Sequence, residues 1–286
     1  ASAILLRSGA TGITRAHYCM TTSTRLLSRR RFLPLFLTQL LNAFNDNLYK
    51  TAMVLFVVYS VYNDEAKEAQ FSAIASGVFI LPFFLLSALA GQLADMRDKA
   101  RIIRMVKLAE IAIMTVGAAG LLIAWQDAAC ARAVDICLAG PPPRLAADLA
   151  IPLLLAALFA MGVHSTFMGP IKYAILPQHL EREEVLSGTG LVEAGTYLAI
   201  LVGTILAGWI EVEVAAGAIL LIALVGYLTS RWVPPAPAQG VVVPIDWNPF
   251  TSSVRVVAST MTNPQVYYAI LAISFFWTIG AVLFIQ

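Results

Sequence analysis

Apolar blocks long enough to cross a membrane constrain the fold of this chain more than any other feature of its sequence. The hydrocarbon core of a bilayer is about 30 Å thick, so a crossing helix needs roughly 20 mostly apolar residues. We predict six such spans, at residues 32–61, 71–93, 102–125, 150–169, 188–210 and 214–232. A seventh run begins near residue 265 and is still apolar at Gln286, so we expect it to be truncated. The expected fold is all-α and integral to the membrane.

The composition agrees with this assignment and argues against other classes of protein. Hydrophobic residues make up 59% of the chain and charged residues only 13%, whereas average soluble proteins have about 25% charged residues. The net charge of +2 is too small to indicate nucleic-acid binding. We find no metal-ligand cluster, phosphate-binding glycine-rich loop or catalytic triad in the sequence. We therefore expect a protein that is not an enzyme and needs no cofactor or metal.

The distribution of lysine and arginine predicts the orientation. If the N-terminus is cytoplasmic, the outer loops hold only Lys67, Arg132 and Arg144. The cytoplasmic segments then hold Arg25, Arg29, Arg30, Arg31, Arg97, Lys99, Arg101, Arg104, Lys107, Lys172, Arg182, Arg231 and Arg255. This asymmetry follows the positive-inside rule and favours a cytoplasmic N-terminus.

Five parts of the chain are expected. Residues 1–19 lack an initiator methionine and a sustained apolar core, so we interpret them as an upstream non-native or disordered segment; a signal peptide is the alternative. The others are a cytoplasmic N-terminus (20–31), the six-helix bundle (32–232), a Pro-rich cytoplasmic loop with a short interfacial helix (233–264), and the start of a second bundle (265–286). Cys130 and Cys137 share an outer loop and would form a disulfide if that loop faces an oxidising compartment.

A polar stripe interrupts the first span. Asn42, Asp46 and Lys50 are successive i,i+4 neighbours on one helical face, and Asn45 lies beside them. An unpaired carboxylate at this depth costs about 3 kcal/mol or more, so Asp46 must face protein or water. One interpretation is a polar group lining a substrate pathway. The other is an internal ion pair between Asp46 and Lys50 that only fixes helix packing.

The turn after the second span resembles the Gly-x-x-x-Asp-Arg-x-Gly-Arg-Lys signature of major facilitator transporters. The candidate residues are Gly91, Asp95, Arg97, Lys99 and Arg101. Gly91 and Asp95 match and Lys99 replaces an arginine, whereas three positions differ: Met96, Asp98 and Ala100. The resemblance implies a charge latch between two bundles that breaks and re-forms during alternating access. The alternative is an ordinary solvated cytoplasmic loop.

A second set of motifs is more specific. Its pieces are Gly169-Pro170-x-Lys172-Tyr173, Leu176-Pro177, Glu193-Ala194-Gly195-Thr196 and Gly203-Thr204. Together with the first span, they resemble the lysophospholipid transporter family of the major facilitator superfamily, which includes members fused to an acyltransferase and an acyl-carrier-protein ligase. The resemblance covers about residues 30–286.

This resemblance implies the fold, the function and the partners. The chain would be the N-terminal half of a multi-pass transporter in the inner membrane of a Gram-negative bacterium. It would move lysophospholipids inward by alternating access for re-acylation. Its partners would be the lipid bilayer, the lysophospholipid substrate, a C-terminal transporter half and a fused or separate acyltransferase.

Small residues mark the fifth span. Gly195, Ala199, Gly203 and Ala207 recur every four residues and predict a smooth face for close helix contact. Glu193 lies near the same end as Lys172, and we expect these two to pair. In the fourth span, His164 is interpreted as a hydrogen-bond partner between helices more readily than as a proton relay.

Two other functions are compatible with the same residues. The first is a major facilitator transporter for a small solute or drug, in which Asp46 could couple transport to protons. The second is a non-transporting membrane anchor for an acyltransferase farther along the chain.

Overall fold

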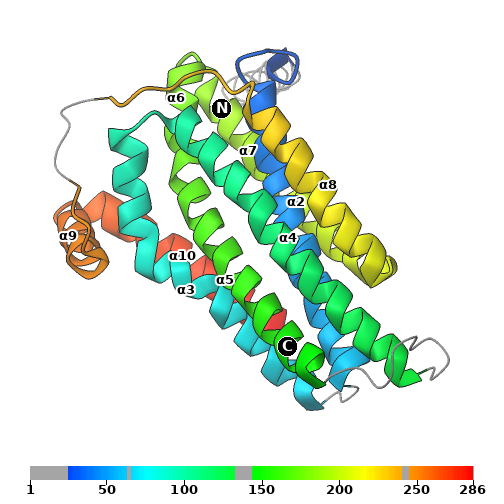
Figure 1. Cartoon of the computed structure of the whole chain (residues 1–286). Helices are drawn as coiled ribbons and strands as arrows, with labels where there is room; N and C mark the ends of the chain where they lie inside the picture. The colour runs from blue at the N-terminus through cyan, green and yellow to red at the C-terminus, as the bar shows by residue number, and fades with distance from the viewer. Residues whose placement is uncertain (1–24, 63–65, 133–143, 240–244, 286) are drawn as a thin grey trace, which may run out of the picture.

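The structure is a computed structural model that describes residues 25–62, 66–132, 144–239 and 245–285. Within these ranges the chain is helical and has no strand. The long helices between residues 33 and 230 run up and down along one bundle, as Figure 1 shows. In chain order they are α2 (Leu33–Phe56), the π-helix η1 (Val57–Tyr62), α3 (Ala66–Met96), α4 (Lys99–Arg132), α5 (Arg144–Ala174), α6 (Leu176–His179), α7 (Val185–Trp209), α8 (Val212–Ser230), α9 (Pro249–Met261) and α10 (Pro264–Ile285). The segment 1–19 and Cys137 lie outside the described residues.

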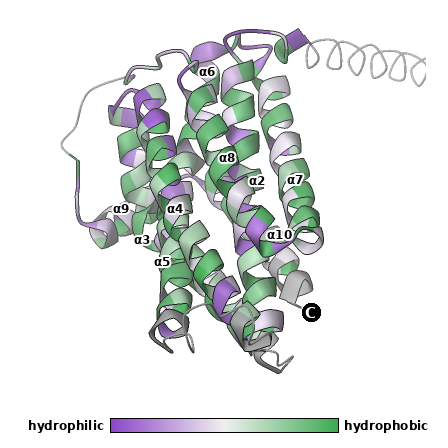
Figure 2. Ribbon diagram, turned by 45° about the vertical axis from the view of Figure 1, so that its right-hand side comes forward, coloured by the Kyte–Doolittle hydropathy of each residue, from purple (hydrophilic) through white to green (hydrophobic). Residues whose placement is uncertain are grey.

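Five of the described helices are long and apolar enough to cross a membrane: α3, α4, α5, α7 and α8. The first predicted span corresponds to α2 and η1, which run on without a break. Helix α2 is not among the five, because its polar stripe lowers its hydropathy. The all-α, multi-span membrane fold is confirmed. In Figure 2 most of the ribbon of the long helices is green, the colour of apolar residues, as expected of helices that cross a membrane.

Close backbone contacts hold the helices together. Helix α2 packs against α7 and α8, while α5 packs against α3 and α4. A methyl group added at Gly203 of α7 would lie 2.7 Å from the Phe44 carbonyl oxygen of α2. One added at Gly162 of α5 would collide with the Phe79 carbonyl oxygen of α3. Glycine is needed at both positions because two backbones approach there.

Two apolar cores lie at different levels of the bundle. The core near the described N-terminal end includes Phe32, Leu35, Ile103, Met168 and Val233. The core nearer the other end includes Leu48, Met53, Met114, Met161 and Ile219. Along α2, α4 and α5, each helix contributes to both cores, and buried polar residues occupy the level between them. The bundle therefore has a polar layer between two apolar ones.

The segment after α8 folds back on the bundle. Helix α9 begins after Asn248, whose side chain accepts hydrogen bonds from the backbone N–H groups of Phe250 and Thr251. It packs against α3, where Gln92 donates to Ser252 (2.9 Å). The expected short helix is present, and its apolar residue Val254 is exposed. Its place at the membrane interface stays a prediction.

Candidate functional site

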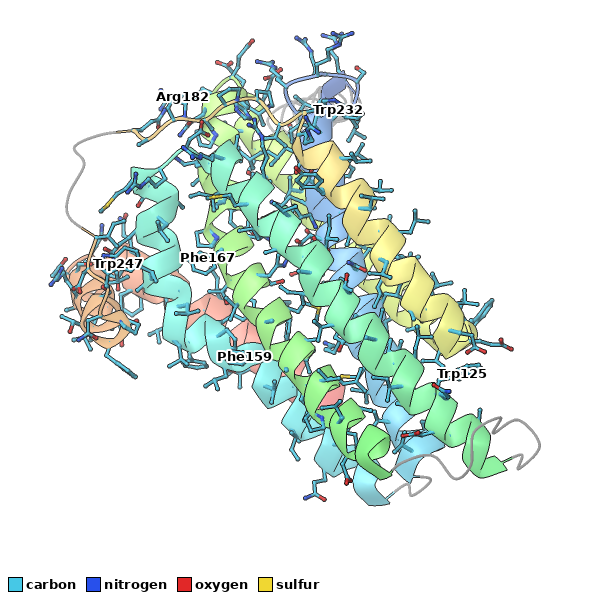
Figure 3. The ribbon with its side chains drawn as sticks, viewed as in Figure 1. Trp125, Phe159, Phe167, Arg182, Trp232 and Trp247 are labelled. Atoms are coloured by element: carbon cyan, nitrogen blue, oxygen red, sulfur yellow. The ribbon has the colours of Figure 1, made fainter. Side chains whose placement is uncertain are left out.

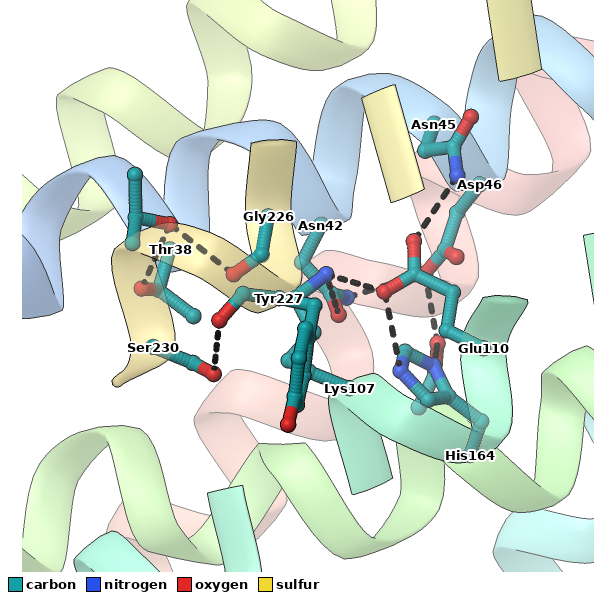
Figure 4. Close-up of polar contacts among 12 residues, drawn as sticks. Thr38, Asn42, Asn45, Asp46, Lys107, Glu110, His164, Gly226, Tyr227 and Ser230 are labelled. Atoms are coloured by element: carbon teal, nitrogen blue, oxygen red, sulfur yellow. Dashed lines mark hydrogen bonds and ion pairs between the residues drawn. The ribbon is translucent and has the colours of Figure 1, made fainter. Parts of the chain in front are cut away.

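The polar layer is the candidate site, and three helices build it. We call its members the buried polar cluster: Asn42, Asn45 and Asp46 on α2, Lys107 and Glu110 on α4, and His164 and Ser165 on α5. Each of these residues is at most 8% exposed. Figure 4 shows their side chains meeting between the helices. Charged residues are rarely buried at this depth, so their hydrogen bonds decide what the layer can do.

Asp46 is held by two neutral donors. Its Oδ2 atom accepts a hydrogen bond from Ser165 on α5 (2.5 Å) and another from Asn42 on its own helix (3.2 Å). Lys50, one turn farther along α2, lies over the Phe79 ring, 5.7 Å from its centroid. These two hydrogen bonds to Asp46 come from Ser165 and Asn42, whereas the polar stripe of the sequence suggested Lys50 as its partner.

The ion pair of the cluster is contributed by α4. Lys107 and Glu110 are fully buried, and the lysine ammonium donates to Glu110 Oε2. Both residues also bond to α2, since Lys107 donates to Asn42 (3.2 Å) and Asn45 donates to Glu110 Oε1 (2.8 Å). His164 completes the group, with Nε2 3.4 Å from Glu110 Oε2. A buried pair with this many further partners meets the condition under which burial of charge is tolerated.

A glycine on a fourth helix makes room for this ion pair. A methyl group at Gly226 of α8 would lie 3.2 Å from Lys107 Nζ. Two hydroxyl groups next to this level join α2 to α8, as Thr38 donates to Thr229 (3.1 Å). Four helices, α2, α4, α5 and α8, therefore meet around the Lys107–Glu110 pair.

Two oxygen atoms of the cluster remain open. Asp46 Oδ1 and Asn45 Oδ1 are buried and accept no hydrogen bond from the part of the chain that the structure describes. Buried polar atoms are nearly always paired, and an unpaired one calls for a specific explanation. Both atoms can accept a donor from a bound molecule or from water. The described residues contain no group of three or more His, Cys, Asp or Glu placed to hold a metal ion.

The sequence predicted only part of this cluster. It singled out Asn42, Asn45 and Asp46, and it interpreted His164 as a partner between helices. It counted Lys107 among the cytoplasmic charges, whereas this side chain is fully buried, and it missed Glu110. The signal was present, since two opposite charges three residues apart enter an otherwise apolar run of α4.

The residues of the predicted latch are not joined to one another by an ion pair among the described side chains. Asp95, Arg97 and Arg101 are exposed, and Lys99 is buried. Asp98, which departs from the signature, does bond to its surroundings. Its Oδ1 atom accepts from the N–H groups of Ala100 (2.9 Å) and Ala236 (3.2 Å).

This contact fastens the segment after α8 to the start of α4. The Lys99 N–H donates to the Ala236 carbonyl oxygen (2.9 Å), and Arg104 donates to the Val233 carbonyl oxygen (3.0 Å). Val233 and Ala236 are almost completely buried. We call this contact between residues 233–236 and the α3–α4 turn the linker clamp. The sequence did not predict it.

The second set of motif residues connects α5 to α7. Lys172 lies 3.2 Å from Glu193, as expected, and its ammonium sits 4.7 Å from the centroid of the Tyr173 ring. The Tyr173 hydroxyl donates to the same carboxylate. Gly169 has open space around it, and Pro170 lies inside α5. The Lys172–Glu193 pair lies at the end of the bundle that also carries the linker clamp.

Comparison with known proteins supports the resemblance, although no protein-family profile matches the chain. It is 26% identical over 272 residues to the lysophospholipid transporter LplT of Serratia proteamaculans, covering 92% of this chain and 58% of the relative. It is 25% identical to the same-named protein of Yersinia enterocolitica (74% and 44%) and 24% identical to that of Yersinia pestis (90% and 55%). The chain spans about half the length of the curated relatives it matches. The resemblance expected from the motifs is confirmed.

Proposed function

We propose that this protein moves lysophospholipids across the bacterial inner membrane by alternating access and delivers them for re-acylation. The observation that carries the proposal is similarity along almost the whole chain to proteins named lysophospholipid transporter. Those relatives are transporters and not enzymes by name, which favours transport over catalysis. The N-terminus would be cytoplasmic, and the remainder of the transporter would supply the facing bundle.

The chemistry of the substrate fits the buried polar cluster. A lysophospholipid has a polar head group with hydrogen-bond donors and a single acyl chain. We propose that Asp46 offers its open Oδ1 atom to the head group, while Asn42 and Asn45 line the same pathway. Lys50 would line the same pathway, one helical turn beyond Asp46. The apolar helix faces would remain available to the acyl chain.

The two motif regions would control access. In the proposal, the α3–α4 turn with Gly91, Asp95, Arg97, Lys99 and Arg101 acts as a latch toward the second bundle. Because Asp95, Arg97 and Arg101 are exposed here, their charges are available to partners outside the described residues.

The second motif region, at Lys172 and Glu193, would hold two helices together at the same end of the bundle as that latch. We propose that the pair formed by Lys172 and Glu193 keeps α5 and α7 together while the bundle moves as one body. A fused or separate acyltransferase would use the delivered lipid.

Uptake by proteoliposomes containing the full-length protein tests this function. Labelled lysophosphatidylethanolamine should enter the inner leaflet in a protein-dependent way, and a water-soluble solute should not compete. Competition by a small solute or drug would favour the solute transporter. Absence of any uptake, with acyltransferase activity retained in the membrane, would favour the anchor.

A further inference from the structure

A small cavity lies away from the buried polar cluster, toward the end of the bundle opposite the linker clamp. It measures about 190 Å³ and is lined by Ser60 and Val61 of η1, Ala124 and Asp127 of α4, and Ile151 of α5, among others. Ser60 is about 20 Å farther along the first span than Asp46, at 1.5 Å per helical residue. Figure 3 shows Trp125, a neighbour of this cavity in the sequence, at the opposite end of the bundle from Trp232. The cavity is thus separate from the candidate site.

The acidic residue of this lining, Asp127, is partly exposed. Its Oδ2 atom is shielded from solvent and accepts no hydrogen bond from the described residues, and none of the ion pairs among them includes Asp127. The other described residues of the wall are mostly alkyl, and Ser60 is the other polar residue among them. A charged oxygen among alkyl groups is stabilised by a cation or by a strong donor. The cavity is therefore complementary to a positive group on a short hydrocarbon.

The backbone at this point is unusual as well. Val57–Tyr62 forms a π-helix at the end of α2, and this segment places Ser60 and Val61 in the cavity wall. Short π-helical turns are rare and occur often at functional sites. The irregular segment and the unpaired oxygen are independent observations that coincide at one cavity.

The size and the wall chemistry restrict the ligand. Sites for complete drug-sized molecules measure about 300–1,000 Å³, so this cavity holds only a small group. A hard divalent cation requires about six to eight oxygen ligands, which these alkyl walls do not offer. An alkylammonium group needs only a carboxylate, a hydroxyl and apolar contact for its carbons.

We propose that this cavity is a second head-group site, which takes the ammonium group of a zwitterionic lysophospholipid before the lipid reaches the buried polar cluster. Asp127 pairs with the ammonium, Ser60 hydrogen-bonds beside it, and the alkyl wall contacts the ethanolamine carbons. The inference rests on the proposed function for the source of the ammonium group. It adds a preference for head groups that carry an amine.

Cysteine chemistry tests the site without relying on transport. Ser60→Cys is made in the full-length protein after its native cysteines, Cys19, Cys130 and Cys137 among them, are replaced by serine. A positively charged methanethiosulfonate reagent should label the introduced thiol faster than a negatively charged one. Asp127→Asn should abolish this difference, whereas Asp148→Asn should keep it, because Asp148 is exposed near the start of α5. Val61→Cys provides a second reporter if the first variant does not fold.

Lipid protection then identifies the ligand. Lysophosphatidylethanolamine should slow the labelling, and lysophosphatidylglycerol, which has no amine, should not. Equal protection by both lipids, or protection by free phosphoethanolamine at the same concentration, would overturn the assignment to an amine-bearing lipid. Absence of any charge preference would overturn the site itself. A charge preference in a protein that moves no lysolipid would instead refute the proposed function and leave the cation site standing.

Discussion

Asp46 on α2 and Ser165 on α5 are joined by a 2.5 Å hydrogen bond across the bundle, although 119 residues separate them in the chain. This bond uses one carboxylate oxygen and leaves the other, Oδ1, without a hydrogen-bond partner among the described residues. The carboxyl group therefore has one oxygen that fixes it to the structure and one that, in the proposed function, would bind the head group.

Asp46→Asn should leave insertion nearly normal and sharply reduce lysolipid uptake. Asparagine can still accept from Ser165 and Asn42, so the loss of stability should be about 1 kcal/mol or less. Lys50→Met is the comparison, since Lys50 lies over Phe79. Uptake in proteoliposomes and thermal stability in detergent are the measurements. Recovery of both in the double variant would show that Asp46 and Lys50 form a purely structural pair.

The Lys107–Glu110 pair should be essential for stability. Lys107→Met or Glu110→Gln alone leaves an uncompensated buried charge and should cost about 3–5 kcal/mol. The double variant should cost less than the sum, because it removes both charges together. Thermal unfolding in detergent measures these losses. The control is the partly exposed pair Lys172 and Glu193, whose removal should cost about 1 kcal/mol or less.

The stability lost on substituting a glycine of α7 should depend on how closely the neighbouring helix approaches that glycine. Gly203→Ala should destabilise the protein by about 1–3 kcal/mol, because the new methyl group meets the Phe44 carbonyl oxygen. Gly195→Ala should cost less, since it meets the movable ring of Phe36. Gly208→Ala should be neutral, because its surroundings are open. If all three variants melt at the same temperature, this face of α7 is not a packing surface.

The linker clamp should depend on Asp98 and not on the signature residue Asp95. Asp98→Ala removes the acceptor for the Ala236 N–H and should increase hydrogen exchange at the Ala236 amide, which lies between prolines. Asp95→Ala should leave that exchange unchanged, because Asp95 is exposed. Mass spectrometry of peptides from the full-length protein reports both. Unchanged exchange in Asp98→Ala would contradict the clamp.

Cysteine labelling in intact cells should report the orientation. Arg97 and Asp148 are both exposed and lie near opposite ends of the bundle. An impermeant reagent added to spheroplasts should label Asp148→Cys and should miss Arg97→Cys until the membrane is opened. The reverse pattern would place the N-terminus outside.

The sequence allowed the helices to be predicted because membrane thickness sets the length of each apolar run. The helices extend past the predicted bounds, as at α4, where 102–125 was expected and Lys99–Arg132 is helical. Short-range regularity also located the glycine face of α7. These features depend on residues close together in the chain, so a pattern is enough to find them.

The buried ion pair and the linker clamp depend on contacts between distant segments. The positive-inside rule counts Lys107 in the same way whether its side chain lies in a loop or in the core. The rule therefore could not predict that Lys107 is buried. Asp98 was noticed only as a departure from a signature. Its role depends on Ala236, which is 138 residues away.

The polar layer between two apolar cores also limits how the helices can move. A slide of one turn, about 5.4 Å, would bring Lys107 and Glu110 of α4 against the methionines and leucines of a neighbouring core. Such a shift of α4 would break the hydrogen bonds of Lys107 and Glu110 to Asn42 and Asn45 of α2, and it would carry the ion pair into apolar surroundings. The layer thus opposes sliding of one helix along another. The layer therefore favours motions in which the helices keep their relative heights and the bundle moves as one body.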